Sequence, residues 1–363
     1  MEQTLGHVTH TQNLREAVAR QSELTVTWLP IPFDVNSVAR LLPGYANWSV
    51  RASLRARAGL AKGVAAHAYD ALFFHTQVTA LFSAGLMRRI PSVISLDATP
   101  LNFDSVGAAY GHRTAGSGWL DARKHQVNRD GFRTAQALIA WSAWTAESLV
   151  RDYGVARERI TILAPGASRQ YFDIGDARAA RDSDTPVRLL FVGGDFTRKG
   201  GALLLEAVRG ARTRVPFEVH VVTRDPVPDT PRVVTHHGVG PNSPELLALF
   251  ARSDVFVLPS LGECLSIALM EAAAAGLPII ATDVGALREA AIDGRSALVI
   301  PPGDARGLRA AIERLVDEEA TRARLGRAGL ALAHDKFDAE RNNQAILRIV
   351  ASVACPISER SVA

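Results

Sequence analysis

The chain has 363 residues, of which 47% are hydrophobic and 21% charged, so it is long enough for two folded domains and its composition is that of a globular protein. Its formal net charge is only +4, and its 41 Lys and Arg are spread along the chain without an RNA-binding motif, which argues against nucleic acid as a partner. No apolar run approaches the roughly 20 residues of a membrane span, and no signal-peptide pattern opens the chain, so a cytoplasmic location is expected.

The first predicted elements are a Gly-containing loop and then a helix over Leu14–Arg20. Met1–Thr4 is shorter than a typical strand of about five or six residues, so either the first strand is unusually short or the natural start lies upstream. His10 falls between them, where a His either approaches a site or caps the helix and faces solvent. A strand is predicted over Leu24–Leu29.

The next predicted element is a basic helix over Tyr45–Lys62, which carries Arg51, Arg55, Arg57 and Lys62. Apolar residues between these cations make weak peripheral contact with anionic lipid one interpretation. The apolar stripe is thin, so a solvated basic face is the favoured interpretation.

Strands over Asp70–Phe74 and Ser92–Leu96 are separated by a predicted helix over Val78–Arg88. This alternation indicates a doubly wound parallel sheet, and the carboxyl ends of such strands face the ligand site. Asp97 lies at one of these ends. It either accepts a hydrogen bond from a sugar hydroxyl or an acceptor nucleophile, or it is a turn residue before Pro100, and both interpretations stay open.

The rest of the first half continues the pattern after a predicted long loop, Leu101–Gly118. The elements expected are a helix over Trp119–Arg133, a strand over Ala137–Trp141, a helix capped by Ser142, and a strand over Ile160–Leu163. A polar linker follows, and its Asp182-Ser-Asp184 has the spacing of a metal-binding motif. Because the motif lies in a charged linker and not at the end of an apolar strand, no metal site is predicted.

A candidate phosphate site opens the second half. The strand Val187–Val192 is followed by a loop with Gly193, Gly194, Arg198 and Lys199, and then by a helix from Ala202. A glycine-rich loop that enters a helix presents free N–H groups and the positive end of the helix dipole to an anion. Cations at a helix N-terminus are repelled by the positive end of the dipole unless an anion binds between them. A basic pair at this position is therefore better explained by anion binding than by a solvated loop.

The stretch Asp254–Thr282 is predicted to be a strand–loop–helix–strand unit, with a strand over Val255–Leu258, a helix over Leu265–Ala275 ended by Gly276, and a strand from Ile279. Glu263 lies in its loop, at the ligand edge of the sheet. Glu271 lies on an otherwise apolar helix, where a carboxylate is costly to bury unless hydrogen-bonded, and paired sugar hydroxyls would supply those bonds. Cys264 and Cys355 fit no metal-ligand spacing and are expected to be reduced thiols.

Glu263-x7-Glu271 followed by Ala275-Gly-Leu-Pro278 resembles the signature of the retaining family 4 glycosyltransferases (glycosyl transferases group 1), and the resemblance is strongest from about Val187 to Asp304. That family has the GT-B fold, so the resemblance implies two Rossmann-like, doubly wound α/β domains that face each other across a cleft. The implied segments are an acceptor-binding domain over 1–172, a linker over 173–186, a nucleotide-sugar domain over 187–336 and a helix over 337–352 that crosses back to the first domain.

The resemblance also implies roles for individual residues. Glu271 holds the ribose of the donor, Glu263 contacts the donor sugar, and relatives approach the nucleobase near Gly238. Many relatives carry a His where this chain has Asp97. The residues expected to bind the donor are Glu271, Arg198, Lys199, Gly193, Gly194, Leu265, Ser266, Gly238 and Gly6, and those expected to act in catalysis are Glu263, Arg198, Lys199 and Asp97.

The implied activity is metal-independent transfer of a sugar from a UDP-, GDP- or ADP-sugar to a sugar, lipid-linked or small-molecule acceptor, with retention of configuration and no covalent enzyme nucleophile. Cell-surface polysaccharide, glycolipid and secondary-metabolite synthesis are all compatible settings, and the sequence does not determine the oligomeric state. Two alternatives on the same fold are a nucleotide-sugar epimerase and a non-catalytic partner protein. The intact acids and cations argue against the second, and a Rossmann dehydrogenase is disfavoured because no Gly-x-Gly-x-x-Gly follows an early strand.

Overall fold

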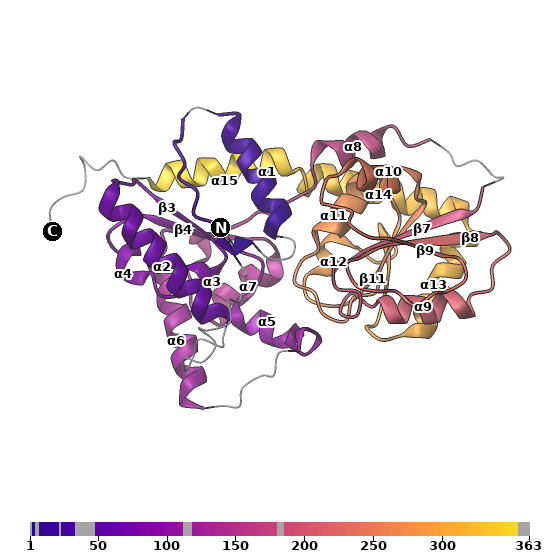
Figure 1. The fold of residues 1–363 in the computed structure, drawn as a ribbon, viewed down its shortest axis with the longest axis horizontal. Helices are drawn as coiled ribbons and strands as arrows, with labels where there is room; N and C mark the ends of the chain where they lie inside the picture. The colour runs from indigo at the N-terminus through magenta and orange to yellow at the C-terminus, as the bar shows by residue number, and fades with distance from the viewer. Residues whose placement is uncertain are drawn as a thin grey trace. The chain divides into compact units, whose positions relative to one another are not determined.

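The structure is a computed structural model, and it describes residues 2–3, 7–21, 23–32, 48–111, 118–179 and 185–354. The chain divides into two compact units (Figure 1). Unit 1 comprises Met1–Phe103, Thr114–Ala164 and Arg341–Ala363, and unit 2 comprises Asp104–Arg113 and Pro165–Glu340. Each unit is built on a parallel sheet with helices, which confirms the predicted α/β fold class.

Unit 2 contains a six-stranded parallel sheet in the order β12-β11-β10-β7-β8-β9. Its strands are β7 (Val187–Val192), β8 (Phe217–Val222), β9 (Val233–His236), β10 (Val255–Leu258), β11 (Ile279–Thr282) and β12 (Ala297–Ile300). The order runs outward in both directions from the neighbouring pair β7 and β10, as in a dinucleotide-binding sheet. In such sheets ligands bind at the carboxyl ends of the strands where the order reverses, so the loops after β7 and β10 define the expected site.

The helices of unit 2 are α8 (Arg169–Asp176), α9 (Gly201–Gly210), α10 (Pro244–Arg252), α11 (Ile267–Ala274), α12 (Leu287–Ala290), α13 (Ala305–Asp317) and α14 (Glu319–Lys336). Helix α11 is apolar on nearly every side because α8 and α14 pack against it. The segment expected to be a linker begins inside α8 at Asp173, and Asp182-Ser-Asp184 lies outside the described residues. The last helix, α15 (Ala339–Val353), begins in unit 2 and continues in unit 1.

Unit 1 contains a four-stranded parallel sheet, β3-β4-β5-β6, and a separate parallel pair, β1-β2. The strands are β1 (Glu2–Gln3), β2 (Ile31–Pro32), β3 (Leu72–His75), β4 (Ser92–Leu96), β5 (Ala137–Ala140) and β6 (Ile160–Ile162). Alternate residues of β4 pack on opposite faces of the sheet. Ile94 joins the core formed with Phe132 and Tyr153, whereas Val93 joins the core formed with Leu14 and Ile346.

The helices of unit 1 are α1 (His7–Ala19), α2 (Trp48–Ala66), α3 (Gln77–Ala80), α4 (Ala84–Met87), α6 (Trp119–Thr134) and α7 (Ala143–Arg151), while α5 (Pro100–Val106) passes from unit 1 into unit 2. Ser142 caps α7 as predicted, because its side chain accepts a hydrogen bond from Thr145 N. The helix predicted over Val78–Arg88 is instead two short helices, α3 and α4.

Three further predictions for the first half are wrong. Helix α1 begins at His7 and not at Leu14. Residues Leu24–Leu29 form no strand: they pair with no strand among the described residues, and Trp28 and Leu29 pack against core clusters of unit 1. The segment expected to be a loop from Leu101 contains α5 and a 3₁₀-helix, η2 (Gly107–Tyr110), which belongs to unit 2.

Helix α5 has a local sequence signal. Thr99 N donates to Asn102 Oδ1 at 3.2 Å, and Asn102 N donates to Thr99 Oγ1 at 3.1 Å, so the two residues close a capping box. Pro100 occupies the first helical position, where its missing N–H costs nothing.

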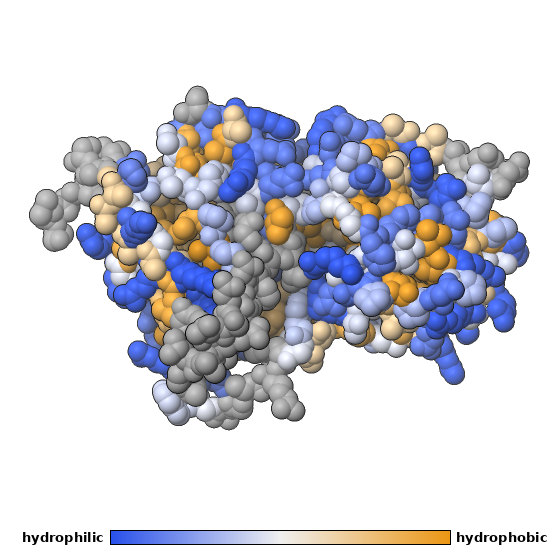
Figure 2. Space-filling model, viewed as in Figure 1, coloured by the Kyte–Doolittle hydropathy of each residue, from blue (hydrophilic) through white to orange (hydrophobic). Residues whose placement is uncertain are grey.

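No helix among the described residues is both long and apolar enough to cross a membrane. On the face shown in Figure 2, hydrophobic residues form small patches among hydrophilic ones. Cys264 is buried and is not part of a disulfide within the described residues, and Cys355 lies outside them.

Candidate functional site

The loops after β7 and β10 contact each other through their backbones. Gly200 has a φ of +80°, and a Cβ at this position would lie 1.9 Å from the carbonyl oxygen of Pro259. Leu261 N donates a hydrogen bond to Arg198 O at 2.9 Å. Only glycine therefore fits at Gly200, and the close approach fixes the basic loop against the loop that carries Glu263.

Arg198 is almost completely buried between these loops, with an exposed fraction of 4%. Its Nη1 donates to Gly262 O at 2.9 Å and lies 3.5 Å from Glu263 Oε2, and its Nε donates to Asp195 Oδ2 at 3.2 Å. The guanidinium lies 4.4 Å from the centre of the Tyr110 ring. Burial lowers the pKa of Arg198, but Glu263, Tyr110 and Asp195 outweigh burial and raise it overall, so the group is a fixed cation.

Lys199 forms an ion pair with Glu263, whose exposed fraction is 7%. Burial opposes ionisation of Glu263, but Lys199 and Arg198 outweigh it and hold the pKa of the carboxyl below its usual value. The Glu263 backbone is fixed by Gly285, where a Cβ would lie 1.9 Å from Glu263 O. The structure thus brings together three of the four predicted catalytic residues: the cations Arg198 and Lys199 both pair with the buried carboxylate of Glu263.

Glu271 lies on α11 and is 5% exposed. Burial raises the pKa of its carboxyl to about 7, against the opposing effects of the nearby Tyr171 hydroxyl and the charge of Lys199. Ser266 precedes α11, and its buried hydroxyl has no hydrogen-bond partner within the described ranges. A ligand with hydroxyl groups would give the Ser266 hydroxyl a partner and would stabilise the ionised form of the Glu271 carboxyl.

The other residues predicted to bind the donor are only partly brought together. Leu265 is buried in the loop after β10, and a Cβ at Gly193 would lie 3.0 Å from Lys199 Cγ. Gly238 follows β9, two strands from β7, and its surroundings are open, since a Cβ there would meet no atom within 4 Å. Gly6 lies outside the described residues.

Two residues near the cations were not predicted. A Cβ at Gly194 would lie 3.0 Å from Arg224 Nε, so Arg224 adds a third cation beside the glycine-rich loop. The sequence offered a signal for Arg224, because it follows the predicted strand β8 and the carboxyl ends of parallel strands lie at the same edge of the sheet, where the ligand binds. Tyr110 had no such signal, since its contact with Arg198 joins residues far apart in sequence.

A second polar cluster lies in unit 1, at the carboxyl ends of β3 to β5. The rings of His7 and His10 each lie 5.0 Å from the ring of His75 and 5.1 Å from that of Trp141. His7 Nε2 lies 3.7 Å from Asp97 Oδ2, so Asp97 faces an imidazole at this edge. Within the part of the chain that the structure describes, no group of His, Cys, Asp and Glu side chains has the arrangement of a metal site.

His10 lies within α1 and is fully buried, which rules out the second of its two interpretations, a residue that caps a helix or faces solvent. Burial and the nearby His7 lower its pKa from 6.5 to about 3, and burial likewise lowers the pKa of His75. Both imidazoles are therefore neutral in the folded chain at neutral pH, and their ring nitrogens have no hydrogen-bond partner among the described residues.

Replacing His10 by Phe is expected to reduce the acid sensitivity of the fold. With a folded pKa below the unfolded one, His10 contributes stability that is present above pH 6.5 and is lost as the pH falls toward 3. Between pH 7 and pH 5 the wild type should lose about 2 kcal/mol more unfolding free energy than His10→Phe. Urea unfolding at both pH values measures this difference, with His67→Phe, an exposed histidine, as the control. Equal losses in wild type and His10→Phe would contradict the assignment.

Two protein families match the chain. Residues 6–170 match the family described as "Glycosyltransferase Family 4", and residues 186–318 match "Glycosyl transferases group 1". Among curated proteins, the glycogen synthase of Mycobacterium tuberculosis (strain CDC 1551 / Oshkosh) is 28% identical over 286 residues, which cover 75% of this chain and 64% of that protein. The chain thus spans less than two-thirds of the length of this relative.

Solved structures show the same fold. Sucrose-phosphate synthase from Thermosynechococcus elongatus superposes with a TM-score of 0.73 at 18% identity, covering 97% of this chain and 94% of that one. HepE from Anabaena, solved in complex with UDP, superposes with a TM-score of 0.62 at 17% identity, covering 89% and 86% of the two chains. These similarities confirm the architecture expected from the sequence.

Proposed function

Since the chain belongs to the glycosyltransferases, with a Family 4 region followed by a group 1 region and the GT-B fold, we propose that it transfers a sugar from a nucleotide diphosphate sugar to an acceptor. The observation that carries this proposal is the buried cluster of Arg198, Lys199 and Glu263 at the point where the strand order of unit 2 reverses. Family membership supports transfer over the epimerase and non-catalytic alternatives.

The donor diphosphate is proposed to bind across the start of α9. Arg198 and Lys199 supply two cations, Arg224 a third, and the first N–H groups of the helix add partial positive charge. In the structure Glu263 forms ion pairs with both Arg198 and Lys199. Diphosphate binding would draw Lys199 toward the phosphate oxygens and leave the Glu263 carboxylate facing the donor sugar.

The chemical step is proposed to retain the configuration of the donor without a metal ion. The bond between the anomeric carbon and the diphosphate breaks, and the diphosphate leaves with the electron pair, stabilised by Arg198 and Lys199. The acceptor hydroxyl oxygen bonds to the same face of that carbon, and its proton passes to the departing phosphate oxygen. Asp97 in unit 1 remains the candidate for contact with the acceptor hydroxyl.

Glu271 and Ser266 are proposed to bind the ribose of the donor. A buried carboxyl with a pKa near 7 gains most from hydroxyl donors, because they stabilise its charged form. The structure of HepE with UDP makes a UDP-sugar the first donor to test, followed by the GDP- and ADP-sugars expected from the sequence. The proposed acceptor is a sugar, a lipid-linked sugar or another small molecule, and the proposed location is the cytoplasm.

Thermal unfolding with a nucleotide panel tests this proposal. A ligand at a hundred times its dissociation constant adds about 2.7 kcal/mol to the unfolding free energy, so one of UDP, GDP and ADP should raise the unfolding temperature by several degrees. The corresponding nucleoside monophosphate is the control and should have a smaller effect, because it presents fewer oxygens to the cations. The absence of stabilisation by all three diphosphates and their sugars would contradict the proposal.

A further inference from the structure

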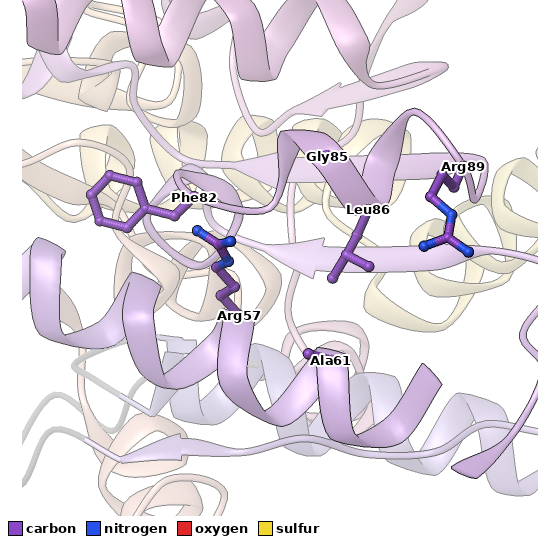
Figure 3. A pocket seen from close by; sticks show the side chains of 6 residues that line it. All are labelled: Arg57, Ala61, Phe82, Gly85, Leu86 and Arg89. Carbon is purple, nitrogen blue, oxygen red and sulfur yellow. The ribbon is translucent and has the colours of Figure 1, made fainter. Parts of the chain in front are cut away.

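Helices α2 and α4 of unit 1 enclose a groove of about 320 Å³ (Figure 3). We call it the α2–α4 groove, and its lining residues are Arg57, Ala61, Phe82, Gly85, Leu86 and Arg89. In Figure 3, Leu86 of α4 points toward Ala61 of α2, and the guanidinium groups of Arg57 and Arg89 lie on either side of them. The groove thus combines an apolar floor with a cation on each side.

The two arginines of the groove are exposed, and no ion pair connects either to an acidic side chain within the described residues. They belong to a local concentration of positive charge. Between Trp48 and Pro91 the cations are Arg51, Arg55, Arg57, Lys62, Arg88 and Arg89, and the one acidic residue is Asp70. Arg51 is buried, and the other five cations of this segment remain a basic excess, since the whole chain is nearly balanced with 41 basic and 37 acidic residues.

This arrangement selects among classes of ligand. A purely apolar ligand would cover the arginines without neutralising them, which is unfavourable. A small anion would use the arginines and leave Phe82 and Leu86 unused. A ligand with a phosphate joined to an acyl chain uses both parts of the groove.

We propose that the α2–α4 groove binds an anionic phospholipid at a membrane surface, with the phosphate between Arg57 and Arg89 and the beginning of an acyl chain on Leu86 and Phe82. The apolar stripe of α2 alone is too thin for this role, which is why the sequence favoured a solvated basic face. The structure supplies the apolar part from α4 and Phe82, beside the cations of α2. The surrounding cations, Arg55, Lys62 and Arg88, would add attraction to anionic headgroups.

The test is co-sedimentation of the full chain with phospholipid vesicles. The chain should bind vesicles that contain phosphatidylglycerol and not vesicles of phosphatidylcholine alone, and binding should weaken as salt is added. Gly85→Glu is the most specific variant, because Gly85 lines the groove and a Cβ there meets no atom within 4 Å, so a negative charge is added at the groove without a clash at the backbone. It should weaken vesicle binding by about tenfold, whereas Gly85→Ala should not.

A matched pair of double variants separates the groove from general electrostatic attraction. Arg57→Glu/Arg89→Glu should lose binding by more than about tenfold, and Arg306→Glu/Arg309→Glu, which changes the net charge equally on exposed sites of α13, should retain most of it. Thermal unfolding checks that each variant folds.

Three outcomes would overturn the inference: equal loss in both double variants, unchanged binding in Gly85→Glu, or displacement of the chain from vesicles by inorganic phosphate at low concentration, which would indicate a simple phosphate site. None of these readouts uses sugar transfer, so the inference and the proposed function can fail separately.

Discussion

Replacing Lys199 by Ala should both destabilise the chain and weaken its binding of a nucleoside diphosphate. Lys199 is the closest partner of the buried Glu263 carboxylate, and Arg198 at 3.5 Å is the remaining one. Removing one partner of a buried ion pair leaves an uncompensated charge, and with Arg198 still present we expect a loss of roughly 3 kcal/mol in unfolding free energy. Loss of one charge-assisted bond to phosphate should weaken diphosphate affinity by about 10- to 100-fold.

A double variant separates the two effects. In Lys199→Ala/Glu263→Gln the neutral amide needs no counter-ion, so stability should return toward that of the wild type while diphosphate affinity stays low. Glu263→Gln alone removes the negative charge that the two cations share, so it should bind diphosphate at least as tightly as the wild type and yet turn over donor more slowly. Denaturant unfolding and calorimetric titration measure these quantities. Full recovery of diphosphate affinity in the double variant would show that Lys199 serves only as the counter-ion of Glu263.

Replacing Glu271 by Gln should stabilise the unliganded chain above neutral pH and weaken donor binding. Because the folded pKa of about 7 lies above the ordinary value of 4.5, the native state holds this proton more tightly than the unfolded state. The contribution of Glu271 to stability is therefore lost as the pH rises from 4.5 to 7, and above pH 7 ionised Glu271 costs about 3 kcal/mol. A glutamine at this position does not incur that cost.

Unfolding free energies at pH 5 and pH 8 measure this difference, with Glu206→Gln, an exposed carboxyl on α9, as the matched control. Wild type and Glu271→Gln should differ by about 2.5 kcal/mol more at pH 8 than at pH 5. Donor affinity should fall in Glu271→Gln, because an amide accepts hydrogen bonds from ribose hydroxyls more weakly than a carboxylate does. A variant that is stabilised and yet binds donor normally would remove Glu271 from the nucleotide site.

The sequence predicted the frame of unit 2 well, because strands buried on both faces are continuous apolar runs. The bounds of β7 and β10 were predicted from such runs, and Gly276 was predicted to end α11, where it has a φ of +69°. Glu263, Arg198 and Lys199 were each expected near the site. Their mutual ion pairs were not, since these depend on the two loops being neighbours in the sheet, and strand order is not encoded in local periodicity.

The errors in the first half have the same origin. His10 packs against His75 and Trp141, which are far from it in sequence. The residues around His10 in the sequence do not indicate that contact, so its burial could not be predicted. The residues Leu24–Leu29 have strand propensity but pair with no strand in the part of the chain that the structure describes, and without such pairing propensity alone does not produce a strand. Helix α5 was the avoidable error, because Thr99, Pro100 and Asn102 are a local signal for a helix start.

The most direct test of the central claim is an NMR measurement of the sugar product. The wild-type chain would be incubated with the nucleotide-sugar that stabilises it best, with candidate sugar acceptors and with water as the simplest acceptor, and the first-formed anomer would be recorded before mutarotation. We expect donor to be consumed, nucleoside diphosphate to be released, and the first product to have the anomeric configuration of the donor. A first product of inverted configuration, or release of the sugar from a covalent adduct on Glu263, would contradict it.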